Sequence, residues 1–326
     1  MWRRWSLLAQ TYEAAGDWPQ AALAYEQSVA HSHEHDQQGE RLNLATSWLE
    51  AKAPWLALEA LEALRDDLLI DDTERALHRH LLGRIHLQLD NPQQSLDHLQ
   101  VAWHLATEAA DAGETPPDDF RFDLRFALAQ TYAALGRFAE ASANYAAALE
   151  SAPHDQRSLT RHEYAYVLFE TGELLAARDL LRDVLKDGDY PFRGDAYADL
   201  ADITLRLGDA DEARDLAEQG LELGATANAS LCLANIAAEL FLFDEAEMWL
   251  ERTLSASSPG DEFWLAASQL LVDTLAQQGY PDPSRVIRHA ERVLEHLPPS
   301  DEATLVLQHH IGEAKARLGG AKRWLN

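Results

Sequence analysis

Residues 132–141 read YAALGRFAEA, and the pattern continues through Tyr145 and Ala148 to Pro153. Apolar residues recur in this stretch at steps of three and four, which is the spacing of a helix with one buried face. Gly136 lies between two such runs, where one helix must stop and the chain must turn, because glycine adopts positive φ without a steric penalty. The stretch therefore predicts two short antiparallel helices joined by a tight turn.

The same order of small, aromatic and turn residues recurs along most of the chain. Further copies lie at 12–21, 171–177, 207–213 and 243–246. A small residue in the middle of each first helix fixes the register, and we place it at Ala9, Ala45, Gly83, Ala129, Ala165, Ala201, Ala234 and Val272. These positions are separated by 36, 38, 46, 36, 36, 33 and 38 residues, which indicates a repeat array. We attribute the longest interval to an inserted loop at 112–119, which contains two prolines.

These repeated residues resemble the tetratricopeptide repeat family. In 122–155 the alanines, aromatics, glycine and closing proline fall in the family's order, whereas Lys52 to Trp55 and Asp90 to Pro92 replace the glycine turn in two units. The resemblance implies an all-α fold, a right-handed superhelical solenoid of about eight antiparallel helix hairpins in a single array over 1–326. A closing helix is expected at 301–318. We place the units at about 2–35, 38–71, 76–111, 122–155, 158–191, 194–227, 228–260 and 265–299.

The charge and composition of the chain exclude several classes of function. Its 326 residues include 27 Lys and Arg against 55 Asp and Glu, so the formal net charge is −28. That balance argues against binding nucleic acid or an anionic membrane surface, because both require clustered cations. No stretch approaches the roughly 20 apolar residues of a membrane span, and the N-terminal apolar run is too short for a signal peptide. We expect a cytoplasmic protein, or a periplasmic one if this is a segment of a larger exported protein.

The sequence holds no catalytic motif, so we predict neither an enzyme nor a cofactor. It has no glycine-rich phosphate loop after a strand and no Gly-x-Ser-x-Gly elbow. The single cysteine, Cys232, lies between two leucines and is expected to be a small buried side chain instead of a reactive thiol. His31, His33 and His35 are weak candidates for a metal site, which would require an extended segment. The alternative, which we favour, is a polar connection between two units.

The first helices of such arrays line a concave groove, where members of this family usually hold an extended peptide or a partner's helix. The side chains expected to face it lie one position after each small residue, at Gln10, Thr46, Arg84, Gln130, Tyr166, Asp202, Asn235 and Asp273, with Glu313 on the closing helix. A second set lies three residues before the small residue, at Ser6, Leu42, His80, Phe126, His162, Ala198, Leu231 and Gln269, with His309 on the closing helix. From the second set we retain Phe126 and His162 as partner-binding candidates. The first set is almost all hydrogen-bonding, which suits a groove that holds a peptide backbone.

The charged residues at these groove positions limit the kind of partner that we predict. Chaperone-binding members of the family use a carboxylate clamp, which needs a groove rich in Lys and Arg with asparagines, whereas these positions offer only Arg84 and Asn235. Asp202 and Asp273 make the C-terminal half of the groove anionic. We therefore expect a protein or peptide partner that is neutral or basic.

Three functions remain open at the level of the sequence. The first is a non-catalytic protein-protein interaction scaffold. The second is a sensor, regulatory or assembly arm of a larger protein, because arrays of this kind resemble those attached to bacterial transcription regulators, signalling ATPases and exopolysaccharide export machines. The third is self-association through the terminal repeats.

Overall fold

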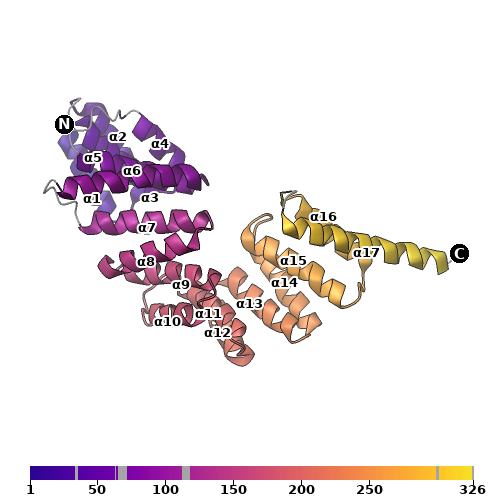
Figure 1. Cartoon of the computed structure of the whole chain (residues 1–326). Helices are drawn as coiled ribbons and strands as arrows, with labels where there is room; N and C mark the ends of the chain where they lie inside the picture. Colours follow the sequence, from indigo (N-terminus) through magenta and orange to yellow (C-terminus); the bar gives the residue numbers. More distant parts are fainter. Residues whose placement is uncertain (34–35, 63, 65–71, 112–117, 299–300, 325–326) are drawn as a thin grey trace. The chain divides into compact units, whose positions relative to one another are not determined.

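The computed structural model describes residues 1–326 apart from 34–35, 63, 65–71, 112–117, 299–300 and 325–326 (Figure 1). Within the described residues there are seventeen helices and no strand, so the all-α prediction is confirmed. The chain divides into two compact units, Met1–Thr171 (unit 1) and Gly172–Asn326 (unit 2).

The helices are short, and successive helices form antiparallel hairpins. Unit 1 contains α1 (Trp2–Ala14), α2 (Trp18–His31), α3 (Gln37–Glu50), α4 (Pro54–Glu62), α5 (Asp72–Gln88), α6 (Pro92–Asp111), α7 (Asp118–Ala134), α8 (Phe138–Ser151) and α9 (Arg157–Glu170). Unit 2 contains α10 (Leu174–Val184), α11 (Arg193–Arg206), α12 (Ala210–Glu222), α13 (Thr226–Glu239), α14 (Phe243–Ala256), α15 (Glu262–Gln277), α16 (Pro283–Leu294) and α17 (Glu302–Trp324). Odd-numbered helices are the first helices of the predicted units, and even-numbered helices are the second.

A residue with positive φ lies seven positions after each predicted small residue. These turn residues are Gly16, Lys52, Asp90, Gly136, Gly172, Gly208, Phe241 and Gly279. They repeat with the same separations as the small residues, and all eight small residues are buried. The register derived from the sequence is therefore confirmed. At three turns a residue with a side chain adopts the left-handed conformation, so the hairpin imposes this conformation even where glycine is absent.

Aspartates cap the N-terminal ends of several helices. Asp17 accepts a hydrogen bond from the backbone N–H of Gln20 at 3.3 Å, and Asp209 accepts one from that of Glu212 at 3.0 Å. Asp282 accepts two such bonds at the start of α16. These caps pair N–H groups that have no partner inside the helix, and they help to fix where each turn ends.

The first helices of each unit form a layer. In unit 1, α3 contacts α5, α5 contacts α7 and α7 contacts α9, in addition to the contacts between helices that follow one another. In unit 2, α11 contacts α13, α13 contacts α15 and α15 contacts α17. Within each unit the second helices pack against the first helix of their own hairpin and against the first helix of the next one. Each unit is thus a stack in which a hairpin is stabilised by its immediate neighbours.

The two units fill their cores with different side chains. In unit 1, Tyr25 and Tyr145 occupy equivalent positions on second helices, and each is only 1% exposed. Their hydroxyls donate hydrogen bonds of 3.1 Å to the carboxylates of Glu13 and Glu163. In unit 2 the core is mainly aliphatic, with Trp264 buried at the start of α15.

Two predicted connecting and terminal segments can be compared with the helix bounds. The predicted insertion at 112–119 lies outside the described residues except at its end, because α7 already begins at Asp118. The closing helix predicted at 301–318 is α17, which is longer than expected and runs to Trp324. None of the helices in the described part of the chain is long and apolar enough to span a membrane.

Candidate functional site

The candidate site is a set of equivalent side chains on the first helices of each unit. We call it the first-helix row, and it consists of Gln10, Thr46, Arg84, Gln130, Tyr166, Asp202, Asn235 and Asp273. Gln10 and Tyr166 are exposed, and the other six are half-buried, although the small residue directly before each is buried. A helix turns by about 100° per residue, so one step carries the side chain from the helix contact to its open edge. The row therefore reaches solvent in both units.

In unit 1 the row carries one charge, which is already paired. Nη2 of Arg84 lies 2.6 Å from Oε1 of Glu50, on the preceding first helix. The hydroxyl of Thr46 donates to the backbone carbonyl of Leu42 at 3.0 Å. Tyr166 is 54% exposed, which is a large fraction for an aromatic side chain. This part of the row offers hydrogen-bonding groups and an aromatic surface instead of net charge.

A half-buried carboxyl group, Glu163, lies beside the row in unit 1. Burial raises the pKa of Glu163 above its usual range, while hydrogen bonds from Tyr145 and Gln130 act in the opposite direction. Burial also raises the pKa of Tyr145 well above its usual value. These bonds tie the side chain of Gln130, a row residue, to the aromatic core. Phe126 and His162, the two further candidates on α7 and α9, are half-buried.

In unit 2 two of the three row residues are carboxylates. Oδ1 of Asp273 lies 3.1 Å from Nε2 of His310, whose Nδ1 lies 2.9 Å from the hydroxyl of Tyr280. Burial raises the pKa of Asp273, and the neighbouring His310 opposes that shift. Asp202 lies 3.7 Å from Arg206, one turn later on α11. Both carboxylates in this part of the row therefore have a basic neighbour, and Asn235 is its neutral member.

The structure corrects four positions of the second predicted set, which are not on the open face. The buried residues, each 9% exposed or less, are Ser6, Leu42, His80 and Ala198. Helix side chains lean toward the N-terminus, and this position faces the next first helix. The hydroxyl of Ser6 accordingly donates a hydrogen bond of 3.0 Å to the carboxylate of Glu40 on α3. The rings of His80 and Phe120 on α7 pack edge to face, with centroids 5.4 Å apart. Burial lowers the pKa of His80 to about 3, so its ring is neutral.

The histidine cluster gives no metal site within the described residues. His31 lies in the last turn of α2, where its Nδ1 is 2.7 Å from the carbonyl oxygen of Gln27. His33 is exposed, and His35 lies outside the described residues. In the part of the chain that the structure describes, no three His, Cys, Asp or Glu side chains are placed to hold a metal ion.

The cysteine behaves as expected from the sequence. Cys232 is 5% exposed, and its thiol donates to the backbone carbonyl of Ala198 at 3.2 Å. Burial raises the pKa of this thiol well above its usual value. The prediction of a small buried side chain is confirmed.

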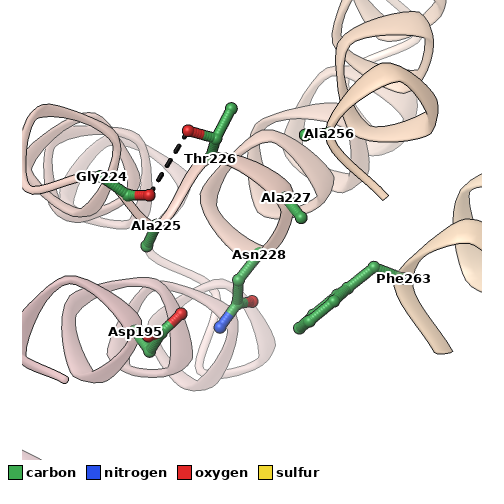
Figure 2. A pocket seen from close by; sticks show the side chains of 8 residues that line it. All are labelled: Asp195, Gly224, Ala225, Thr226, Ala227, Asn228, Ala256 and Phe263. Carbon is green, nitrogen blue, oxygen red and sulfur yellow. Dashed lines mark hydrogen bonds between the residues drawn. The ribbon is translucent and has the colours of Figure 1, made fainter. Parts of the chain in front are cut away.

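Unit 2 also contains an open pocket that the sequence did not predict. Figure 2 shows that its lining comes from the start of α11, the α12–α13 turn with the start of α13, the end of α14 and the start of α15. Its volume is about 440 Å³, and Asp195, Asn228 and Phe263 bring a carboxylate, an amide and an aromatic ring to it. Asn228 donates to Asp199 at 2.9 Å. Four separate elements meet here, so no single repeat carries a pattern that predicts the pocket.

Two family models match the chain, and both describe the tetratricopeptide repeat. One covers residues 122–155 and the other covers residues 5–37. The chain is a tetratricopeptide repeat protein. The resemblance seen in the sequence is therefore confirmed. No curated protein sequence is significantly similar to this tetratricopeptide repeat protein.

Solved structures share its fold at low sequence identity. The apo form of the quorum sensor NprR from B. thuringiensis is 14% identical, with 95% of this chain and 98% of that chain covered and a TM-score of 0.69. The apo form of RapI is 11% identical, with 98% of each chain covered and a TM-score of 0.65. A chain of the APC/C hetero-tetramer Cut9–Hcn1 is 15% identical, with a TM-score of 0.62. There the match covers 93% of this chain but only 54% of that one, so this chain spans about half its length. These likenesses show that the chain shares the helical repeat fold of these structures.

Proposed function

We propose that this tetratricopeptide repeat protein is a non-catalytic scaffold that binds a peptide, or an extended segment of a partner protein, along its first-helix row. The observation that carries the proposal is the regular exposure of that row. On eight first helices, a buried small residue is followed by a side chain that reaches solvent. Amide and hydroxyl groups at such intervals suit the N–H and C=O groups of an extended chain, and Tyr166 supplies aromatic contact area.

A structural neighbour supports peptide as the class of ligand. NprR has also been solved in complex with its cognate peptide NprX, and that structure is 15% identical to this chain, with 95% of this chain and 97% of that chain covered and a TM-score of 0.61. The charge of the row supports a neutral or basic partner, because two of its three members in unit 2 are carboxylates in a chain of net charge −28. The same charge disfavours nucleic acid as a partner.

The proposal can be tested by selecting peptides from an unbiased display library on the purified chain. The affinity of the best peptide is then measured by fluorescence anisotropy for the wild type, Tyr166→Ala and Asn235→Ala. We expect at least one of these row variants to bind about tenfold more weakly, which corresponds to roughly 1.4 kcal/mol. Asp273→Asn should weaken a basic peptide and leave a neutral one unchanged.

Glu26→Ala is the matched control, because Glu26 is exposed on a second helix, α2. It should bind the peptide as tightly as the wild type does. A selection that yields no peptide would contradict the proposal. So would a peptide whose affinity is unchanged by all three row substitutions.

A regulatory arm of a larger protein is the second candidate function, and the likeness to the quorum sensor NprR favours it. In that case the bound peptide should change the assembly of the chain. Sedimentation velocity at several concentrations, with and without the selected peptide, tests this reading. A sedimentation coefficient that depends on neither variable would remove it, and would also remove self-association through the terminal repeats.

A further inference from the structure

The turn between α13 and α14 exposes three consecutive apolar side chains. Leu240 is 49% exposed, Phe241 is 71% exposed and Leu242 is 45% exposed. We call these three residues the turn patch. Single exposed apolar residues are normal on a protein surface, but three in succession at one turn gather apolar area at one place in the chain. The first-helix row is a different surface, so the turn patch needs a separate explanation.

The backbone conformation of Phe241 is strained for a residue with a side chain, and this strain lowers the stability of the fold. Its φ is 57°, in the left-handed region, which is uncommon for bulky residues because the Cβ atom crowds the backbone. The equivalent turn position is glycine in five of the other hairpins. A glycine would adopt this conformation without strain, so stability of the fold gives no reason for a phenylalanine here.

The ring of Phe241 is supported in its exposed position. It meets the ring of Phe243 edge to face, with centroids 6.1 Å apart and planes at 82°. Phe243 begins α14 and is itself half-buried. An edge-to-face pair of this kind holds the exposed ring in place, which lowers the entropy that a partner must remove on binding.

The segment that carries the turn patch is acidic. Residues 236–246 contain three carboxylates and no Lys, Arg or His. Glu245 pairs with Arg214, whereas Glu239 and Asp244 are exposed on either side of the turn patch. An apolar surface flanked by carboxylates complements an apolar surface flanked by cations.

We propose that the turn patch is a second docking surface, which binds an amphipathic helix of another protein whose apolar face is bordered by Lys or Arg. Phe241 enters the apolar face of that helix, and Glu239 and Asp244 attract its basic border. The negative charge disfavours an anionic bilayer as the occupant. A net charge of −28 likewise disfavours a second copy of this chain.

The test uses a synthetic 18-residue amphipathic helix of Leu and Lys, and a second peptide with every Lys replaced by Glu. Binding of each labelled peptide is measured by fluorescence anisotropy with the full chain, up to about 100 μM. We expect the Leu/Lys peptide to bind and the Leu/Glu peptide not to bind. Phe241→Gly should weaken binding of the Leu/Lys peptide at least about tenfold, while its melting temperature stays equal to or above that of the wild type because the strained residue is gone.

Two control variants separate this surface from other effects. Lys52→Gly makes the same backbone change at an exposed turn in unit 1, and it should leave binding of the Leu/Lys peptide unchanged. Tyr166→Ala alters the first-helix row and should also have no effect on this peptide. If Tyr166→Ala weakens binding and Phe241→Gly does not, the peptide occupies the row and the inference is wrong. Equal affinity for the Leu/Glu peptide, no binding at all, or a dimer of the chain alone that Phe241→Gly dissociates would also overturn it.

Discussion

Unit 1 and unit 2 repeat the same hairpin but link successive hairpins with different side chains. Unit 1 uses a series of aromatic rings, in which Phe126 and Tyr145 have centroids 5.7 Å apart and Tyr145 and Tyr164 have centroids 6.1 Å apart. Unit 2 uses ion pairs between second helices, such as those that Arg285 on α16 makes with two glutamates of α14. The difference shows that the repeat requires contact between neighbouring hairpins but not one kind of chemistry.

The first-helix row differs between the units in the same way. In unit 1 its single charged member, Arg84, is paired with Glu50, whereas in unit 2 its charged members are two carboxylates, Asp202 beside Arg206 and Asp273 beside His310. What the two units share is therefore the backbone and the small residues at helix contacts. What distinguishes them is the set of side chains at the edges of those contacts, and these are the side chains that we propose a partner contacts.

The first prediction is that equivalent alanines in the two units respond alike to enlargement. Ala141 and Ala213 are both fully buried at the same position of a second helix. Ala141→Leu and Ala213→Leu should each lower the free energy of unfolding by roughly 1–3 kcal/mol, because the added carbons have no space at a helix contact. Urea unfolding followed by circular dichroism measures both effects.

Ala139→Leu is the control for this pair, since Ala139 is exposed on the same helix as Ala141. It should change stability little. An unchanged unfolding midpoint for Ala141→Leu would count against the register, and a loss in one unit only would count against the equivalence of the hairpins.

The second prediction concerns acid, because His80 in unit 1 corresponds to Ala198 in unit 2, which cannot titrate. The pKa of His80 is lowered to about 3 in the folded chain by burial, then by the charge of Arg84. In the unfolded chain His80 takes up a proton near pH 6.5, whereas in the folded chain it does so only near pH 3. The free energy of unfolding is therefore highest above pH 6.5 and falls as the pH drops from 6.5 toward 3. The contribution of His80 to this loss is about 1.4 kcal/mol at pH 5.5.

His80→Gln, which has no titrating group, isolates that contribution. Its free energy of unfolding should fall less steeply between pH 7 and pH 5.5 than that of the wild type, whatever its stability at pH 7. Parallel pH profiles for the two proteins would show that the buried ring does not govern the response.

The third and smallest effect is that of salt on unit 2. Arg285→Gln removes both ion pairs and should cost about 0.5–1 kcal/mol at low ionic strength, because the partners are partly exposed. At 1 M NaCl the difference from the wild type should shrink, since salt screens such pairs. Arg288→Gln, at an exposed position of the same helix, is the control. A cost for Arg285→Gln that is the same at both salt concentrations would contradict an ionic origin.

The fold could be predicted from the sequence because the small residues and the turn residues repeat together. Ala9 and Gly16 define a step of seven residues that recurs in each unit, and helix contacts tolerate only small side chains at the first position. The turns at Lys52 and Phe241 carry no glycine, yet each lies the same seven residues after its small residue. Spacing alone determines these features, because they arise within one hairpin.

The candidate site could be predicted only in part. The first-helix row follows from the small residue one position earlier on the same helix. Burial of Ser6 and His80 could not be predicted in this way, because it depends on Glu40 and Phe120, which lie on the next first helix. The pocket beside Asn228 likewise depends on several hairpins at once. Features that depend on how neighbouring hairpins stack can therefore be found only in the structure.

The central claim is that the first-helix row is an open surface that a peptide covers, and thiol labelling tests it most directly. The chain has one cysteine, the buried Cys232, so the wild type supplies a slow baseline. Thr46→Cys and Asn235→Cys place a thiol on the row in unit 1 and in unit 2. We predict that a maleimide reagent labels both variants much faster than Cys232, and that a saturating amount of the selected peptide slows at least one of them. Labelling as slow as that of Cys232, or rates that the peptide leaves unchanged, would contradict the claim.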